Sequence, residues 1–248
     1  MAPRLVRGAK RLTHKVKPVY SRHLRPRELP PYFALLRAGW LAASAHWAMS
    51  PVLQSNRLRS MPQLTTARLR LEPFTDAHVN GLNALNADPE VMRYISGRPE
   101  RLEETVGIVQ RVKQRWIDCG YSWWSFIDQA SGELVGAGCL QNLRRGATPA
   151  PDPACPLEIG WRLRRDCWGQ GLATEAAHRI TSFAFDDLRA AEIYAVCDPA
   201  NTASANVMKR LGMQFRGLET WYGKNLATYQ ITSDEWHARA GEAKSDSR

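Results

Sequence analysis

The hydrophobic positions along the chain recur with two different periods. Apolar and polar residues alternate in residues 68–74, and residues 157–163 have the same strand-like composition. In residues 172–188 the apolar positions recur every three or four places, as they do on one face of an amphipathic helix. The same period runs through residues 103–119, and Gly120 follows directly. The pattern predicts a domain that contains both strands and helices.

Further segments extend this pattern. Shorter helices are predicted from Asp76 or Thr75, from Asp88 and from Asn201, because each of these residues can cap a helix start. The remaining strands are predicted at residues 121–127, 134–143, 192–196, 213–221 and 227–231. The last two strands would form a hairpin around residues 222–225. Strands first, then a strand–helix–strand unit with a right-handed crossover, predict an α+β fold, a mixed α/β layer structure.

The charge divides the chain into two parts. Residues 1–60 hold 12 Lys and Arg but one acidic residue, Glu28, whereas residues 61–248 hold 22 Lys and Arg and 23 Asp and Glu. The formal net charge of +10 therefore belongs to the first 60 residues, and the remainder is nearly neutral. A nearly neutral domain is not the type that grips nucleic acid with its catalytic face.

The basic segment at residues 1–60 has three competing explanations. It could be an organellar transit peptide, or an arm that docks on the ribosome, RNA or a membrane surface, where residues 32–53 could lie as an amphipathic helix. It could also be an over-called start, because Met61 directly precedes the first strand motif. We expect this segment to be poorly ordered or partly helical. The expected location is the cytoplasm, with an organellar matrix as the alternative.

The cysteines indicate free thiols and no metal site. Their number is odd and no Cys-x-x-Cys pair occurs, which favours a reducing compartment and makes structural zinc unexpected. They are Cys119, Cys139, Cys155, Cys167 and Cys197.

A glycine turn joins the strand at residues 157–163 to the helix that follows it. The run WGQGLATEA, residues 168–176, contains Gly169 and Gly171, which let the backbone approach an anion closely. The helix start adds unpaired N–H groups and the positive end of the helix dipole. The turn lacks the residues of a Walker A loop and the third glycine of a dinucleotide-binding loop. It therefore predicts a phosphate-binding turn of a different type.

Two further motifs define a resemblance. The run NTASANVMKRLGM at residues 201–213 follows a strand and a turn, and the run LTTARLRLEP at residues 64–73 opens the domain. Together with WGQGLATEA they resemble the GNAT superfamily of acyl-CoA-dependent N-acetyltransferases, specifically its RimJ/RimL-like branch. Trp168 stands where the broader superfamily has Arg or Gln, and Trp is usual there in this branch. The resemblance covers residues 61–237, so residues 238–248 are expected to form a flexible tail.

The resemblance implies a GNAT fold, with a central, mostly antiparallel sheet flanked by helices, and acetyl-CoA as co-substrate. Two strands of that sheet splay apart, and the pantetheine arm lies between them. The residues expected to bind acetyl-CoA lie on the strand before the glycine turn, in the turn and helix start, and on the second motif helix. They are Ile159, Trp161, Leu163, Gly169, Gln170, Gly171, Leu172, Ala173, Thr174, Asn201 and Asn206. Arg162, Arg164 and Arg165 could meet the 3′-phosphate.

The resemblance also implies the reacting groups. Glu158 is the expected base or amine-orienting carboxylate, because partial burial would raise its pKa toward neutral pH. Ordered water is the alternative base. Ser204 is the expected proton donor to the departing thiolate, with Tyr194 and Tyr229 as alternatives.

We therefore expect an enzyme that transfers an acetyl group from acetyl-CoA to a primary amine by direct attack in a ternary complex. The leading acceptor is the N-terminal amine of a protein, by analogy with the branch. A small-molecule amine is the first alternative, and a non-catalytic acyl-CoA-binding module is an alternative of another class. A homodimer is possible.

Overall fold

The computed structural model describes residues 61–147 and 152–245. The expectations for the basic segment at residues 1–60 lie outside the described residues. Within the described ranges, no helix is long and apolar enough to cross a membrane.

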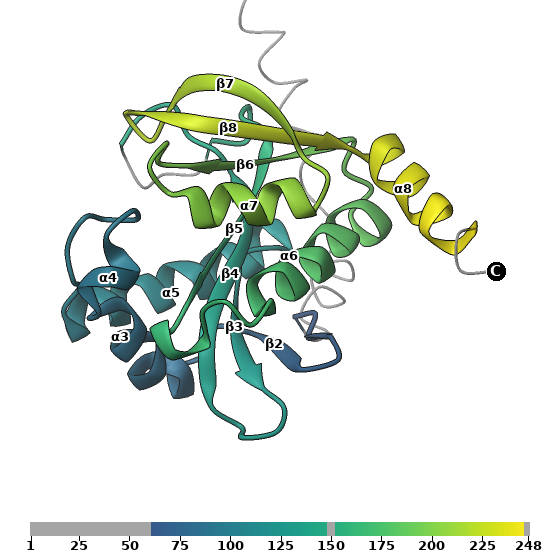
Figure 1. Cartoon of the computed structure of the whole chain (residues 1–248). Coiled ribbons are helices and arrows are strands. Elements are labelled where there is room, and N and C mark those ends of the chain that lie inside the picture. Colours follow the sequence, from purple (N-terminus) through teal and green to yellow (C-terminus); the bar gives the residue numbers. More distant parts are fainter. Residues whose placement is uncertain (1–60, 148–151, 246–248) are drawn as a thin grey trace, which may run out of the picture. The chain divides into compact units, whose positions relative to one another are not determined.

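An eight-stranded sheet runs through the described part of the chain, in the order β1-β2-β3-β4-β5-β6-β8-β7 (Figure 1). Neighbouring strands are antiparallel except for β5 and β6, which are parallel. The strands are β1 (Leu64–Thr65), β2 (Leu69–Pro73), β3 (Trp123–Asp128), β4 (Leu134–Asn142), β5 (Leu157–Leu163), β6 (Glu192–Cys197), β7 (Gln214–Trp221) and β8 (Lys224–Thr232). The predicted fold class, a mixed and mostly antiparallel sheet flanked by helices, is confirmed.

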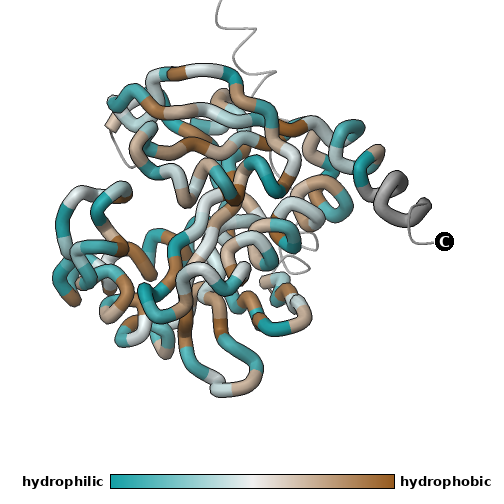
Figure 2. The backbone as a smooth tube through the Cα atoms, in the orientation of Figure 1, coloured by the Kyte–Doolittle hydropathy of each residue, from teal (hydrophilic) through white to brown (hydrophobic). Residues whose placement is uncertain are grey.

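Helices cover both faces of this sheet. The α-helices are α3 (Val79–Asn86), α4 (Pro89–Met92), α5 (Leu102–Cys119), α6 (Leu172–Ser182), α7 (Thr202–Arg210) and α8 (Ser233–Ser245). Turns of 3-10 helix occupy Asp76–His78 and Arg165–Cys167, and a π-helical turn, Phe183–Asp187, continues α6. Apolar residues gather along the strands, whereas loops and outer helix turns are mostly polar (Figure 2).

The two faces of β5 meet different helices. Arg162 hydrogen-bonds Asn86 of α3, so the face of β5 that carries Arg162 and Glu158 lies toward α3. Gly138 of β4 pairs with Trp161, and a Cβ at Gly138 would lie 3.1 Å from Ile180 of α6. The face that carries Trp161 therefore lies toward α6, because successive residues of a strand alternate between faces.

The parallel pair β5–β6 separates soon after it begins. Its register contains a single pair of residues, Glu158 opposite Tyr194. Beyond Glu158 the backbone edge of β5 has no ladder partner on β6 in the described residues. This is the splayed geometry that the resemblance implies.

The last helix, α8, extends into residues 238–248, for which a flexible tail stays the prediction. Helix α8 begins at Ser233 and continues to Ser245. Its start is fixed because Glu235 accepts a hydrogen bond from the backbone N–H of Thr232, and Trp236 is buried beside Phe185. The first turn of α8 is therefore anchored to the domain.

Candidate active site

The glycine turn has the geometry that an anion site requires. Gly169 and Gly171 adopt φ values of +74° and +79°, in the left-handed region that favours glycine. Gly171 is the N-cap of α6 and provides no side-chain cap, so the first-turn N–H groups of Leu172, Ala173 and Thr174 have no side-chain acceptor from it. The geometry is of the kind that binds phosphate groups, and the assignment of these residues to the pyrophosphate of acetyl-CoA stays a prediction.

Side chains around the turn hold its shape. The indole nitrogen of Trp168 donates to the carbonyl of Leu163 at 2.8 Å, and the amide of Gln170 donates to the carbonyl of Asp166 at 2.8 Å. Arg68 donates to the carbonyl of Gln170 at 2.9 Å. Gln170 therefore presents its backbone, and its side chain braces the loop.

The arginines suggested for the 3′-phosphate are engaged elsewhere. Arg164 is paired with Glu133 and Asp166, and Arg165 with Asp88. Arg162 lies on the face toward α3, opposite to the helix that the glycine turn begins.

Another arginine reaches the turn instead. Arg210, at the end of α7, donates to the Oγ1 of Thr174 at 3.1 Å. In the sequence Arg210 shows only as a cation in the last turn of a helix. Its position beside Thr174 makes it a better candidate for a phosphate contact than the three arginines of residues 162–165.

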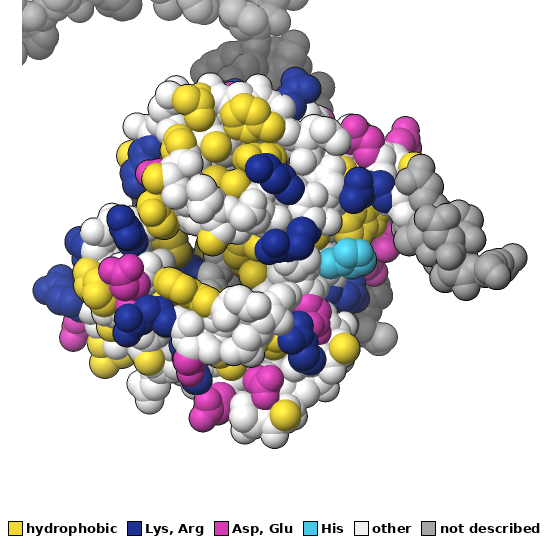
Figure 3. All heavy atoms as spheres, in the orientation of Figure 1, with side chains coloured by type: hydrophobic (Ala, Val, Ile, Leu, Met, Phe, Trp, Pro, Cys, Tyr) yellow, Lys and Arg dark blue, Asp and Glu magenta, His cyan; other side chains and the backbone are white. Residues whose placement is uncertain are grey.

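The splay between β5 and β6 is the expected place for the pantetheine arm. Ile159, Trp161 and Leu163 lie along the part of β5 that has no pairing with β6. The surface is hollowed between α7 and the loop that follows β5 (Figure 3). An extended chain inserted there would meet backbone N–H and C=O groups of β5, as an added strand does.

The second motif helix begins as predicted, but its serine has no fixed role. The Oδ1 of Asn201 accepts a hydrogen bond from the backbone N–H of Ser204 at 3.1 Å, which caps α7. Ser204 is half-buried and Asn206 is exposed. Among the described residues, no hydrogen bond joins the Ser204 hydroxyl to Glu158. Burial raises the pKa of Cys197 to about 11, so this neighbouring residue is held as the thiol.

Glu158 is a buried carboxyl group at the point where the strands separate. The residue is 5% exposed, and burial raises its pKa to about 7. Its Oε1 accepts hydrogen bonds from the Nε2 of Gln141, at 2.7 Å, and from the hydroxyl of Tyr222. Both hydrogen bonds favour the charged form and hold the pKa lower than burial alone would. A carboxyl group with this pKa can accept a proton from an amine near neutral pH.

Tyr222 reaches Glu158 from an unusual backbone conformation. Tyr222 and Gly223 form the two-residue turn between β7 and β8, with φ values of +56° and +69°. A tyrosine in the left-handed region is uncommon and marks either strain or function. The ring of Tyr222 lies under the guanidinium of Arg144, 4.7 Å from its central carbon, and burial raises the pKa of the hydroxyl. In the sequence, Tyr222 shows only as part of a hairpin turn.

Gln141 is oriented by its own neighbours. Its Oε1 accepts hydrogen bonds from Arg115 at 2.7 Å and from the indole nitrogen of Trp123 at 3.1 Å. Because the amide oxygen is engaged there, the amide NH₂ group faces Glu158 and Tyr222. Gln141 is a second hydrogen-bond partner of Glu158 that the sequence did not reveal.

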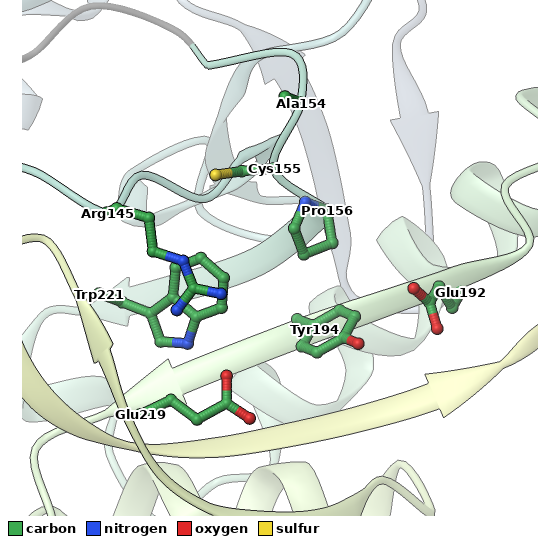
Figure 4. Close-up of a pocket in the computed structure, with 8 residues that line it drawn as sticks. All are labelled: Arg145, Ala154, Cys155, Pro156, Glu192, Tyr194, Glu219 and Trp221. Atoms are coloured by element: carbon green, nitrogen blue, oxygen red, sulfur yellow. The ribbon is translucent and has the colours of Figure 1, made fainter.

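A cavity of about 320 Å³ lies beside this network, on the face of β6 that carries Tyr194 (Figure 4). The guanidinium of Arg145 covers the ring of Trp221 at 3.6 Å within it. Tyr194, the alternative proton donor, lines this cavity, but neither Glu158 nor any residue expected to bind acetyl-CoA does, so we do not assign the cavity to the reaction. Its lining residues are Arg145, Ala154, Cys155, Pro156, Glu192, Tyr194, Glu219 and Trp221.

Across residues 61–147 and 152–245, no group of three or more His, Cys, Asp or Glu side chains is arranged to hold a metal ion.

Similarities to known proteins follow the same motifs. Residues 68–214 match the family described as acetyltransferase (GNAT) domain. An FsC-acetyl coenzyme A-N(2)-transacetylase of Aspergillus fumigatus is 30% identical over 196 residues, which cover 72% of this chain and 80% of that protein. A crystal structure of an acetyltransferase from Agrobacterium tumefaciens superposes with a TM-score of 0.59 at 25% identity, covering 69% of this chain and 95% of that one. The ribosomal-protein alpha-N-acetyltransferase RimL, in complex with coenzyme A, shares the fold with a TM-score of 0.56 at 17% identity, covering 69% and 98%.

Proposed function

The chain belongs to the GNAT acetyltransferase family, and from that premise we propose that Glu158 is the base that prepares a primary amine for acetyl transfer. The chain is an acetyl-CoA-dependent N-acetyltransferase, so the proposal concerns how it works and on what. The observation that carries the proposal is the buried carboxyl of Glu158, with a pKa of about 7, at the point where β5 and β6 separate.

The proposed reaction is a direct attack in a ternary complex. The amine nitrogen gives its proton to the Oε1–Oε2 carboxylate of Glu158 and forms a bond to the thioester carbon. The C–S bond then breaks and the thiolate takes up a proton. Ser204, half-buried at the start of α7, is the proposed donor of that proton. Backbone N–H groups on the unpaired part of β5 would stabilise the oxyanion.

Tyr222 and Gln141 act through Glu158 in this proposal. Their hydrogen bonds stabilise the carboxylate, so the base is ionised at a lower pH than it would be if it were only buried. They are positioning residues, because no substrate atom needs to touch them.

The acceptor class is the finer part of the proposal. We favour a small-molecule amine over the protein N-terminal amine expected from the RimJ/RimL-like branch. The relative at 30% identity is named as an N(2)-transacetylase, whereas the likeness to RimL is 17% and supports the fold alone. Membership of the RimJ/RimL-like branch, contacts of residues 1–60 with the ribosome, RNA or a membrane, a homodimer and a cytoplasmic location stay predictions.

The test is release of coenzyme A thiol by the full chain with acetyl-CoA and a panel of small amines and short peptides. Glu158→Gln should lower kcat/KM by a factor of about 100 or more, because positioned bases contribute roughly 10² to 10⁴. Glu103→Gln, a change at an exposed carboxylate of α5, is the matched control. Unchanged turnover in Glu158→Gln would rule out this residue as the base.

A further inference from the structure

Arg162 brings a positive charge into the interior on the same side of the sheet as Glu158. The residue is 9% exposed, and its guanidinium carbon lies 4.6 Å from the centre of the Trp123 ring. Its Nε donates to the Oδ1 of Asn86 at 3.1 Å. Within the described ranges no carboxylate forms an ion pair with it. A buried charge without a charged partner costs free energy, so its retention calls for an explanation.

Glu100, whose charge acts on Arg162, is linked to it by hydrogen bonds only through an amide. Asn86 accepts from Arg162 and donates from its Nδ2 to the Oε2 of Glu100 at 3.0 Å. This arrangement uses the Nε of Arg162 and assigns no described acceptor to the two terminal nitrogens. The terminal nitrogens form the fork with which arginine binds a carboxylate through two parallel hydrogen bonds.

Arg162 and Glu158 lie at the two ends of a stretch of β5 whose backbone edge is not paired with β6 beyond Glu158. They share a face and are four residues apart, about 13 Å along the strand. Gly160 lies between them on that face and has no side chain. Strand β6 has no pairing with β5 beyond Glu158. A Cβ at Gly160 would lie 3.2 Å from the Sγ of Cys139, so a small molecule would lie along the unpaired edge of β5, with the proposed base at one end and a guanidinium at the other.

We propose that Arg162 binds a carboxylate of the acceptor, so that the enzyme acetylates the amine of an amino-acid-like molecule. This inference rests on the proposed function, because it assigns the acceptor of the same site. The burial of Arg162 also indicates which charge the acceptor group should carry. One carboxylate neutralises one guanidinium, whereas a phosphate dianion would leave a net negative charge in a site that is nine-tenths buried.

Matched pairs of amines test the proposal by kinetics. Lysine and cadaverine, ornithine and putrescine, and phenylalanine and phenethylamine differ within each pair only by a carboxylate. We expect kcat/KM for at least one amino acid to exceed that of its decarboxylated partner at least tenfold. Arg162→Met should remove this preference through KM, Arg162→Lys should keep part of it, and Arg111→Met, at an exposed arginine of α5, should keep all of it.

Two kinetic results would overturn the proposal. One is that the amines without a carboxylate react as well as or better than the amino acids in every pair that reacts. The other is that Arg162→Met slows both members of a pair equally, which would indicate that Arg162 only supports α3 through Asn86.

Binding measurements separate this proposal from the proposed function. Calorimetry with the full chain saturated with coenzyme A should show that at least one of the three amino acids binds, and at least tenfold more weakly to Arg162→Met. Equal binding to both proteins, or binding of none of the three, would contradict the anion site. Binding through Arg162 without any acetyl transfer would leave the anion site standing and refute the proposed function. If amines without a carboxylate are acetylated and Arg162→Met does not change their kcat/KM, the proposed function would stand and the anion site would be refuted.

Discussion

The two sides of β5 differ in the groups that form their sites: backbone groups on one side and side chains on the other. On the side of α6, the expected acetyl-CoA site consists of backbone, with Gly169 and Gly171 in left-handed conformations and the first N–H groups of the helix. On the side of α3, the proposed base is a side chain held by side chains, since Glu158 is bonded by Gln141 and Tyr222. A backbone site depends on local conformation, whereas a side-chain site depends on strands that meet only after folding.

The largest expected effect is the contribution of Glu158 to the pH dependence of the unfolding free energy. Burial raises the pKa of Glu158 from 4.5 to about 7, so the folded protein holds a proton there that the unfolded chain releases between these two pH values. The contribution of Glu158 is therefore most favourable below pH 4.5, and it is lost as the pH rises through about 7. The shift corresponds to roughly 3 kcal/mol of unfolding free energy.

The Glu158→Gln variant has no ionisable group at this position, so it should not lose stability as the pH rises through about 7. We expect its stability advantage over the natural chain to grow by roughly 3 kcal/mol between pH 4.5 and pH 8, as measured by urea unfolding. Glu103→Gln, at an exposed carboxylate, should show no such growth. Parallel stability curves for Glu158→Gln and the natural chain would mean that Glu158 has an ordinary pKa.

The next effect isolates the backbone site. Gly169→Ala places a side chain at φ +74° with no atom within 4 Å, so it strains the turn without a steric clash. Gly132→Ala is a matched control in the turn between β3 and β4, with φ +75° and equally open surroundings. Both should cost about 1 kcal/mol of stability, because that is the typical penalty of a left-handed alanine.

Only Gly169→Ala should also weaken acetyl-CoA binding, by about tenfold, because a shifted N–H cradle loses hydrogen bonds to a charged group. The rise in melting temperature that acetyl-CoA produces is a suitable readout. An equal rise for the two variants would show that the turn is not the cofactor site.

The smallest effect tests the support of the base. Tyr222→Phe removes a hydrogen bond that lowers the pKa of Glu158, so the pKa should move up and the acid limb of kcat/KM with it. The value of kcat/KM at pH 7 should fall by roughly fivefold, because a pKa rise of about one unit leaves about a tenth of Glu158 ionised instead of half. Tyr121→Phe, whose hydroxyl bonds Asn142, should leave the limb in place. If the acid limb of kcat/KM did not move in Tyr222→Phe, Tyr222 would not stabilise the ionised form of Glu158.

The difference between a backbone site and a side-chain site also explains which features could be predicted from the sequence. The bounds of β5, Leu157–Leu163, the turn at Gly169 and Gly171 and the cap at Asn201 were predicted correctly, because each depends on neighbours in the chain. Glu158 was identified by resemblance, and its surroundings were not.

The missing partners come from distant segments. Tyr222 is 64 residues from Glu158 along the chain, and Gln141 is 17 residues away on the neighbouring strand. No local pattern links them. The one local signal was a tyrosine followed by glycine in a two-residue hairpin turn, a position where Asn or Asp is preferred. The partner of Arg162 could not be predicted either, because Asn86 lies on α3, 76 residues away along the chain.

The central claim is that Glu158 is the base, and the pH dependence of kcat/KM tests it most directly. The measurement compares the natural chain with Glu158→Gln for one acetylated amine, whose own deprotonation affects both proteins equally. We predict that the logarithm of the ratio of the natural to the variant kcat/KM rises with pH with a slope of one up to a pH of about 7, and that the ratio is then constant at about 100 or more. A ratio that stays near one, or that does not change with pH, would contradict it.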